Sequence, residues 1–287
     1  LAPDSGGDQL DETAYPILMA WQAGLGRDAT LYTDHIRKAA DFLVARGPSF
    51  GSERWEEQSG FSPSTIAAEI AGLVAAGEIA QTHGDDVRAR LYRAVADHFQ
   101  RSIKDWAVTD TSPYTPTPHF IRLSKTGDPN AAISYGLGNG SPAFDQRAVI
   151  DAGFLELTRL GILPATDPDV LSSLEVVDNV IARDTASGRS FYRYGVAIDP
   201  VAIAGTEDGY GDCYEPDATF CDPSGKPWPG PNDSDDRVNQ GSGHPWPVLS
   251  GERAEHRLQV GDLAGAAALL DAMERYSSAV GLVPEQA

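Results

Sequence analysis

Apolar residues recur at spacings of three and four along much of the chain, which is the pattern of amphipathic helices. Between residues 11 and 25 the pattern includes Ile17 and Trp21, and it ends at Gly26. Seven further segments repeat it. The sequence therefore predicts eight helices in four consecutive pairs, over residues 11–25, 29–45, 62–79, 86–106, 146–160, 167–186, 244–260 and 262–279.

Two of these predicted helices, residues 62–79 and 146–160, carry Ala and Gly on more than one side. Small side chains let helix backbones approach closely, so we expect both helices to be central. The connections 108–142 and 188–243 are far longer than the few residues that compact domains normally use. Sites are often built on such loops, and residues 120–123 alternate as in a short hairpin.

Composition places limits on partners. The 287 residues are 41% hydrophobic, which suffices for one large domain or two modest ones. A net charge of −20 disfavours binding to nucleic acid or to anionic membrane surfaces. The sequence has no run of 18 apolar residues, so we expect no segment to span a bilayer.

The two cysteines, Cys213 and Cys221, are separated by seven residues within one long loop. A local disulfide is the favoured interpretation, because a metal site would need more ligands nearby. With the acidic surface, this pair favours a secreted or extracellular protein, although a cytoplasmic location stays open.

The segment 54–62, Arg-Trp-Glu-Glu-Gln-Ser-Gly-Phe-Ser, is the densest candidate for chemistry. A large apolar neighbour and a second negative charge both raise the pKa of a carboxyl group, which suits a general acid acting on a sugar. Trp55 also offers a flat face on which a pyranose ring can rest. The alternative is a structural one, in which Glu56 and Glu57 offset a helix dipole and Trp55 fills the core.

Two other segments are weaker candidates. Glu285 is the only charged residue of the segment 281–286 after the last predicted helix, and Pro284 stiffens the approach to it. The long loop holds Arg193 between tyrosines, then Tyr210 between Asp-Gly and Gly-Asp, and then Trp246 between prolines. Aromatic, arginine and carboxylate side chains suit sugar binding, but the same residues could simply hold the loop against the helices.

Other common sites are missing from the sequence. It has no Gly-rich phosphate loop, no Gly-x-Ser-x-Gly motif and no His-Glu-x-x-His motif, so dinucleotide, nucleotide triphosphate and zinc sites are not expected. The acidic run 232–236 offers oxygen ligands for calcium, but it lacks the spacing of a calcium loop and is interpreted as a solvated turn.

In combination these segments resemble a known family. Residues 54–57, followed by Gly60, Ser-Pro-Ser-Thr at 62–65 and the helix that starts there, resemble the catalytic-acid motif of the bacterial glucoamylases and glucodextranases, glycoside hydrolase family 15. Pro-Glu-Gln at 284–286 resembles the catalytic-base segment of that family. Segments 193–194, 208–211 and 245–253 follow in the same order, and residues 9–12 resemble the start of its fourth helix.

The resemblance implies a fold and a mechanism. The fold is an all-α (α/α)6 toroid, here forming a catalytic domain over residues 1–287. The activity would be that of an inverting, exo-acting α-glucosidase that releases β-D-glucose from non-reducing ends of α-glucans, with no cofactor. Glu56 would be the general acid and Glu285 the general base. Trp55, Glu57, Arg193, Tyr210 and Trp246 would contact the substrate.

The family's toroid has twelve helices, whereas eight are predicted here. The resemblance therefore implies that the first helices, the last helix and an upstream Trp-Arg-Asp motif are supplied by companion segments or chains. Without them we expect the apolar faces around Ile17, Trp21, Ile66 and Ile70 to be exposed.

Two alternatives stay open. A trehalase-like or isomaltose-specific hydrolase of the same family would share these motifs. A non-catalytic helical protein that binds carbohydrate would share the fold, but we expect it to have lost one carboxylate, and both are present.

Overall fold

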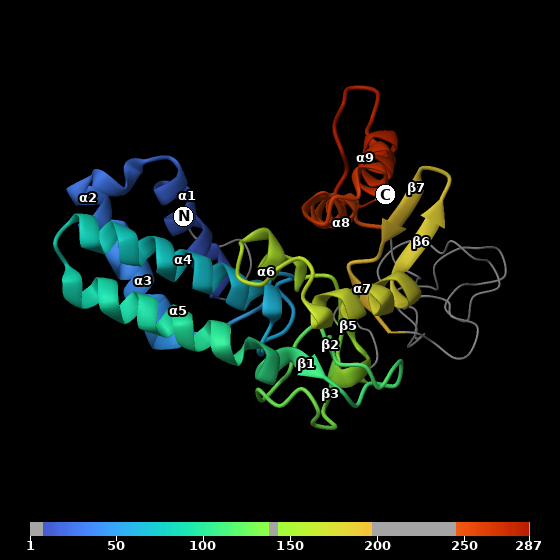
Figure 1. Cartoon of the computed structure of the whole chain (residues 1–287), viewed down its shortest axis with the longest axis horizontal. Coiled ribbons are helices and arrows are strands. Elements are labelled where there is room, and N and C mark those ends of the chain that lie inside the picture. Colours follow the sequence, from blue (N-terminus) through green and yellow to red (C-terminus); the bar gives the residue numbers. More distant parts are fainter. Residues whose placement is uncertain (1–7, 138–142, 197–244, 287) are drawn as a thin grey trace, which may run out of the picture. The chain divides into compact units, whose positions relative to one another are not determined.

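The computed structural model describes residues 8–137, 143–196 and 245–286, which are mainly helical (Figure 1). The chain divides into two compact units. Unit 1 consists of Leu1–Val108, Leu123–Pro129 and Glu156–Leu163, and unit 2 consists of Thr109–Arg122, Asn130–Leu155 and Pro164–Ala287. Two short elements, β1 (Val108–Thr109) and α6 (Leu155–Arg159), include residues at which the chain passes from one unit to the other.

Unit 1 is helical, and the four helices predicted for it are confirmed. Their bounds are α1 Leu10–Gln22, η1 Leu25–Arg27, α2 Ala29–Leu31, η2 Tyr32–Ile36, α3 Arg37–Arg46, α4 Pro63–Thr82 and α5 Asp86–Ala107. The elements α2, η2 and α3 follow one another without a break and correspond to the helix predicted over 29–45. Asp28 starts this helix by accepting hydrogen bonds from the backbone N–H groups of Thr30 and Leu31.

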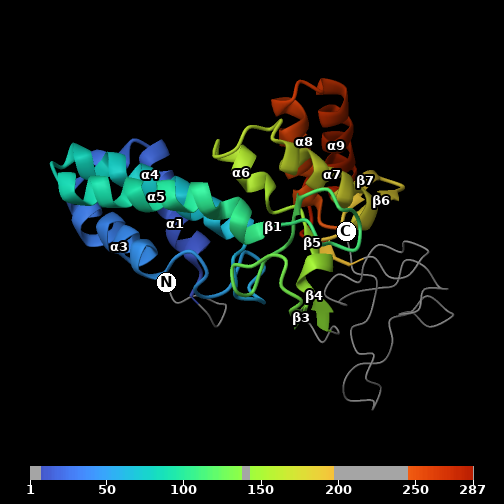
Figure 2. The same cartoon turned by 60° about the horizontal axis from the view of Figure 1, so that its bottom comes forward.

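Helix α4 is the central helix of unit 1, as its small residues predict. It packs against α1 and α5, and α3 lies beside it (Figures 1 and 2). A Cβ atom at Gly72 would lie 3.0 Å from the Cβ atom of Ala14 on α1, and one at Gly77 would lie 3.0 Å from the Arg93 side chain on α5. Glycine at these two positions therefore allows both neighbouring helices to pack closely against α4.

This packing corrects one expectation. Ile17, Ile66 and Ile70 were expected to be exposed, but they are 1%, 0% and 4% exposed because α1 and α4 bury them against each other and against their neighbours. Trp21 is 45% exposed, in agreement with the expectation, and its indole Nε1 donates a hydrogen bond to Glu78 Oε2 at 2.7 Å.

Two carboxyl groups lie in the core of unit 1. Glu69 on α4 is fully buried, and neither of its carboxylate oxygens has a hydrogen-bond partner in the part of the chain that the structure describes. Burial, and to a lesser degree the nearby Asp11, raises the pKa of Glu69 well above its usual value. Burial also raises the pKa of Asp11, in the first turn of α1, to about 6.

Unit 2 combines helices with short antiparallel strands. Its elements are β2 His119–Phe120, β3 Ser134–Gly136, β4 Ala143–Asp145, η3 Gln146–Ala148, β5 Ile150–Asp151, α7 Pro168–Val180, β6 Ala182–Thr185, β7 Gly188–Phe191, β8 Tyr194–Gly195, α8 Pro247–Gln259 and α9 Leu263–Tyr276. Strand β3 pairs with β4, β5 with β8, and β6 with β7. Helices α8 and α9 pack against each other and against β7.

The helix predicted over 146–160, and its central position, are wrong. The structure instead has the short helix η3, the strand β5 and the five-residue helix α6. Ile150 and Asp151 pair with Gly195 and Tyr194 on β8, so a strand partner more than 40 residues away overrides the local helical periodicity. The hairpin expected at 120–123 is reduced to β2, which ends at Phe120.

The helix predicted over 167–186 is confirmed only to Val180, where α7 ends. Residues 182–185 form β6, which pairs with β7 so that Thr185 lies opposite Gly188. Gly188 has a φ of +128°, a backbone conformation that favours glycine, and it allows the tight connection of the hairpin. The last two predicted helices are confirmed as α8 and α9.

Of the described helices, none combines the length and the apolar character that a membrane crossing requires.

Candidate active site

The loop that carries Trp55, Glu56 and Glu57 connects α3 to α4 in unit 1, and its own hydrogen bonds define its shape. The backbone N–H of Glu53 donates to the carbonyl of Gln58 at 2.8 Å, and the N–H of Glu56 donates to the carbonyl of Glu53 at 2.7 Å. The Glu53 side chain is 2% exposed, and its Oε2 accepts a hydrogen bond from the N–H of Trp55 at 3.2 Å. Trp55 therefore lies within a tight turn that a buried carboxylate supports.

A second set of contacts anchors the C-terminal half of this loop. The N–H of Phe61 donates to the carbonyl of Ser124 at 2.8 Å, and Gly60 has a φ of +152°. A Cβ atom at Gly60 would lie 2.7 Å from the Ser124 carbonyl oxygen, so only glycine fits this approach. Lys125 Nζ donates to Gln58 Oε1 at 3.2 Å and to the Ser59 carbonyl at 2.5 Å.

Glu56 lies at the exposed tip of the loop. Its φ is 66°, and among the described residues it is the one non-glycine residue with a positive φ. A backbone strained in this way is retained where the surroundings enforce it, and it is concentrated at functional sites. In the described parts of the chain the Glu56 carboxylate has no hydrogen-bond or ion-pair partner, so it is available to a ligand.

Trp55 and Glu57 flank this carboxylate and are both half-buried. The guanidinium carbon of Arg54 lies 4.3 Å from the centre of the Trp55 ring, within the range of a cation–π interaction. The loop therefore brings Trp55, Glu56 and Glu57 together, as their adjacency in the sequence requires. An acidic group beside an aromatic face is an arrangement that can bind a sugar ring and donate a proton to it.

In unit 2, Arg193 and Trp246 come together although 53 positions separate them in the sequence. Arg193 lies between β7 and β8, and Trp246 immediately precedes α8. The N–H of Trp246 donates to the carbonyl of Phe191 at 2.8 Å, which places the indole 4.9 Å from the guanidinium carbon of Arg193. The two side chains are 6% and 7% exposed.

Arg122 and Tyr194 complete this cluster, and neither was predicted from the sequence to be a site residue. The Arg122 guanidinium carbon lies 3.6 Å from the centre of the Tyr194 ring, while Arg193 Nη2 donates to the Tyr194 hydroxyl at 2.8 Å. Arg122 and Tyr194 are 1% and 0% exposed. One signal was available for Arg122, because it is a charge between Ile121 and Leu123 in an apolar alternating segment.

Glu285, the predicted base, is exposed and lies in an irregular segment after α9 in unit 2. The N–H of Ser278 donates to the Leu282 carbonyl at 2.8 Å, which closes the turn that precedes it. Glu56 belongs to unit 1, so the pairing of the two carboxylates stays a prediction. Tyr210, the predicted Cys213–Cys221 disulfide and the acidic run 232–236 lie outside the described residues.

Within residues 8–137, 143–196 and 245–286, no group of three or more His, Cys, Asp or Glu side chains is arranged to hold a metal ion.

Comparisons with known proteins cover almost the whole chain. A glucoamylase from Clostridium sp. (strain G0005) is 35% identical over 280 residues, which are 98% of this chain and 35% of that enzyme. The crystal structure of a bacterial glucoamylase complexed with acarbose matches 98% of this chain and 36% of that chain, with 36% identity and a TM-score of 0.81. The chain therefore spans about a third of the length of these relatives.

A wild-type glycosidase of known structure matches with a TM-score of 0.59 and 17% identity, over 97% of this chain and 56% of that chain, and at this identity it supports the fold alone. The similarity to the bacterial glucoamylase confirms the expected all-α (α/α)6 toroid class. The family described as Glycosyl hydrolases family 15 matches residues 2–286. The chain thus belongs to glycosyl hydrolases family 15.

Proposed function

We propose that this chain carries the catalytic residues of an inverting, exo-acting α-glucosidase, which releases β-D-glucose from the non-reducing ends of α-glucans. The observation that carries the proposal is the exposed Glu56, held at a φ of 66° beside Trp55 in a loop with an internal framework of hydrogen bonds. The similarity to glucoamylases over 98% of the chain supports it.

In the proposed mechanism, Glu56 protonates the glycosidic oxygen of the bond that breaks. Glu285, in its ionised form, takes a proton from a water molecule that attacks the anomeric carbon from the opposite face. Inversion requires the two carboxyl groups to stand about 6.5 to 9.5 Å apart, with room for that water. Trp55 and Glu57 contact the sugar at the point of cleavage, and Arg193 and Trp246 bind hydroxyl groups and a ring face.

We also propose that companion segments, in the same polypeptide or a bound one, complete the toroid. The share of the glucoamylases that the chain spans, 35% and 36%, supports this. An extracellular location is a further proposal, supported by the net charge of −20 and by the predicted Cys213–Cys221 disulfide.

The test is a hydrolysis assay of the natural polypeptide that carries this chain. Maltotriose, soluble starch, isomaltose, dextran and trehalose would be incubated with it, and the anomer of the first glucose released would be followed by ¹H NMR. Release of β-glucose from maltotriose, soluble starch or dextran supports the proposal, and cleavage of isomaltose alone would indicate the isomaltose-specific alternative. Release of α-glucose would exclude inversion, cleavage of trehalose alone would indicate the trehalase-like alternative, and sugar binding without hydrolysis would indicate a non-catalytic protein.

A further inference from the structure

Unit 2 contains a cavity of about 400 Å³ that shares no residue with the candidate active site. It lies between the end of α7, strand β7 and the facing sides of α8 and α9. Its volume is within the range of small-molecule sites, which is about 300 to 1,000 Å³.

The lining of this cavity is rich in arginine, although the chain has a net charge of −20. Its charged side chains are four arginines and three aspartates: Arg189, Arg253, Arg257, Arg275, Asp178, Asp262 and Asp271. The guanidinium groups outnumber the carboxylates of the lining by one, but Arg189 also pairs with Asp184, outside the lining, at 3.2 Å. The carboxylates are therefore distributed unevenly among the arginines.

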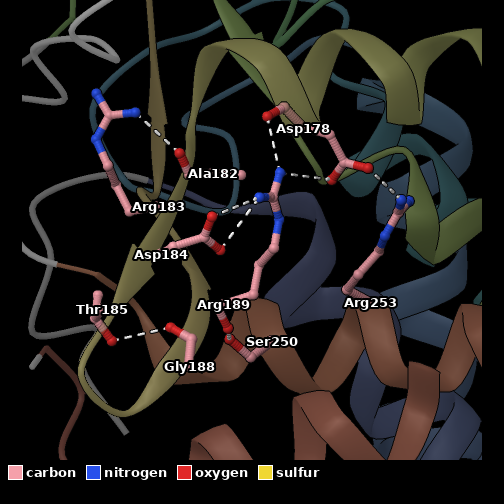
Figure 3. A network of polar contacts seen from close by, with 9 residues as sticks. All are labelled: Asp178, Ala182, Arg183, Asp184, Thr185, Gly188, Arg189, Ser250 and Arg253. Carbon is pink, nitrogen blue, oxygen red and sulfur yellow. Dashed lines mark hydrogen bonds and ion pairs between the residues drawn. The ribbon is translucent and has the colours of Figure 1, made fainter. Parts of the chain in front are cut away.

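Asp178 and Asp262 are already engaged in ion pairs and caps. The Asp178 carboxylate lies between two arginines, with Arg253 Nη2 at 2.9 Å and Arg189 Nη2 at 3.9 Å (Figure 3). Asp262 lies 3.1 Å from Arg257 Nη1 and caps α9 by accepting the N–H of Gly265 at 2.9 Å.

Two of the arginines have guanidinium groups that can still donate hydrogen bonds to an anion. Arg253 is 5% exposed, and its second terminal nitrogen, Nη1, is buried without a hydrogen-bond partner among the residues that the structure describes. An unsatisfied donor on a buried charged group is costly, so an acceptor there would be stabilising. Arg275 donates to the carbonyl of Ser187 at 3.1 Å, and within the described residues no carboxylate lies within ion-pair distance of it.

The electrostatic environment of Arg253 also favours binding of an anion. Burial, together with the like charges of Arg257 and Arg189, lowers the pKa of Arg253 to about 10, although Asp178 opposes the shift. The positive charge is therefore under-compensated where it is buried, and a bound anion would offset it.

We propose that this cavity binds a small molecule through a phosphate or carboxylate group, held by the guanidinium groups of Arg253, Arg257 and Arg275. Planar guanidinium groups match the geometry of these anions. A neutral sugar is disfavoured, because seven of the lining side chains are charged and Phe191 is the one aromatic residue among the lining residues.

The test is isothermal titration calorimetry of the natural polypeptide at constant ionic strength, with inorganic phosphate and citrate as probes. We expect saturable binding of at least one probe at one site, and the probe with the lower Kd identifies the anionic group. Arg275→Gln removes an exposed charge of the cavity and is expected to weaken binding about tenfold. Asp271→Asn removes a repelling charge and is expected to strengthen it severalfold.

Arg90→Gln is the matched control, because Arg90 is an exposed arginine on a helix of unit 1. Its binding constants should equal those of the wild type. Arg253→Met should abolish binding. If this variant does not fold, Arg275→Gln and Asp271→Asn, which change exposed side chains, still decide the proposal. Absence of saturable binding, or equal weakening by Arg275→Gln and Arg90→Gln, would overturn it. None of these readouts depends on hydrolysis, so they test the cavity independently of the proposed function.

Discussion

The guanidinium group of Arg122 stacks on Tyr194, with its central carbon 3.6 Å from the ring centre. The same tyrosine accepts a hydrogen bond from Arg193 at 2.8 Å through its hydroxyl group. Tyr194 is fully buried, so its effect on a ligand acts through Arg193. Stacking against Arg122 therefore positions the Tyr194 ring, and the Tyr194 hydroxyl in turn positions Arg193.

Tyr194→Phe keeps the ring for Arg122 and removes the acceptor for Arg193. We expect the KM for maltotriose to rise about tenfold, the loss of one hydrogen bond to a charged group, with a smaller effect on kcat. Steady-state kinetics of the natural polypeptide would measure both constants. Tyr114→Phe is the control, because the Tyr114 hydroxyl also forms a hydrogen bond within unit 2, in which it donates to the Ala148 carbonyl at 2.7 Å. Equal KM values for the two variants would show that Tyr194 has no positioning role.

Glu56→Gln retains the shape of the side chain but cannot donate a proton to the leaving group. We expect hydrolysis to fall at least about a thousandfold while the far-ultraviolet circular dichroism and the thermal midpoint stay unchanged. Glu57→Gln, at the neighbouring position in the same loop, is the matched control and should retain much more activity. Turnover of Glu56→Gln near that of the wild type would remove Glu56 from the mechanism.

Gly60→Ala tests the anchor of the loop. The new Cβ atom would meet the Ser124 carbonyl oxygen at 2.7 Å in a backbone conformation that only glycine adopts readily, so we expect a loss of about 2 to 4 kcal/mol in the free energy of unfolding. Gly24 also has a positive φ, of +69°, but the Cβ atom introduced by Gly24→Ala would have no neighbouring atom within 4 Å. It should lose only about 1 kcal/mol. Urea unfolding curves of the two variants would show the difference, and equal losses would contradict the assigned contact.

Asp11 makes the stability of the folded chain depend on pH. Its folded-state pKa of about 6 exceeds the ordinary value of 3.8, so the folded state keeps a proton that the unfolded state releases. The contribution of Asp11 to the free energy of unfolding should therefore fall by about 3 kcal/mol as pH rises from about 4 to about 6, and then level off. Asp11→Asn should remove this part of the pH dependence in urea unfolding measured across that range, and an unchanged slope would exclude Asp11 as a source.

Glu69→Gln provides an independent test in the same core. Burial raises the pKa of Glu69 in the folded chain, so the unfolded chain loses this proton at a lower pH than the folded chain does. The free energy of unfolding therefore falls as pH rises. A glutamine at this position does not ionise and removes this effect. The difference in the free energy of unfolding between the variant and the wild type should therefore shift in favour of the variant as pH rises from 4 to neutral. A wild-type-like pH profile of Glu69→Gln would contradict the raised pKa of Glu69 in the folded chain.

The helices of unit 1 could be predicted because their signals are local. The segment 63–82 has apolar and small residues on every side, and it is buried on nearly every side between α1 and α5. The acid loop was predictable for the same reason, since Trp55, Glu56 and Glu57 are adjacent in the sequence.

The arrangement of unit 2 was less predictable, because it depends on pairing between distant segments. Periodicity favoured a helix over 146–160, but the register of β5 against β8 places Asp151 opposite Tyr194. The same pairing positions the ring that Arg122 covers. A single sequence contains no local signal for such a register, so neither the strand nor the stack could be deduced from it.

The internal hydrogen bonds of the acid loop have a consequence for engineering. Hydrogen bonds between atoms of residues 53–58 close the turn at Glu53–Glu56, and the C-terminal half of the loop contacts Ser124 and Lys125. Part of the geometry that sets the backbone at Glu56 is thus encoded in one short peptide. Such a segment is suited to transplantation between related scaffolds, provided that Gly60 and Lys125, which donates hydrogen bonds to the loop, are moved with it.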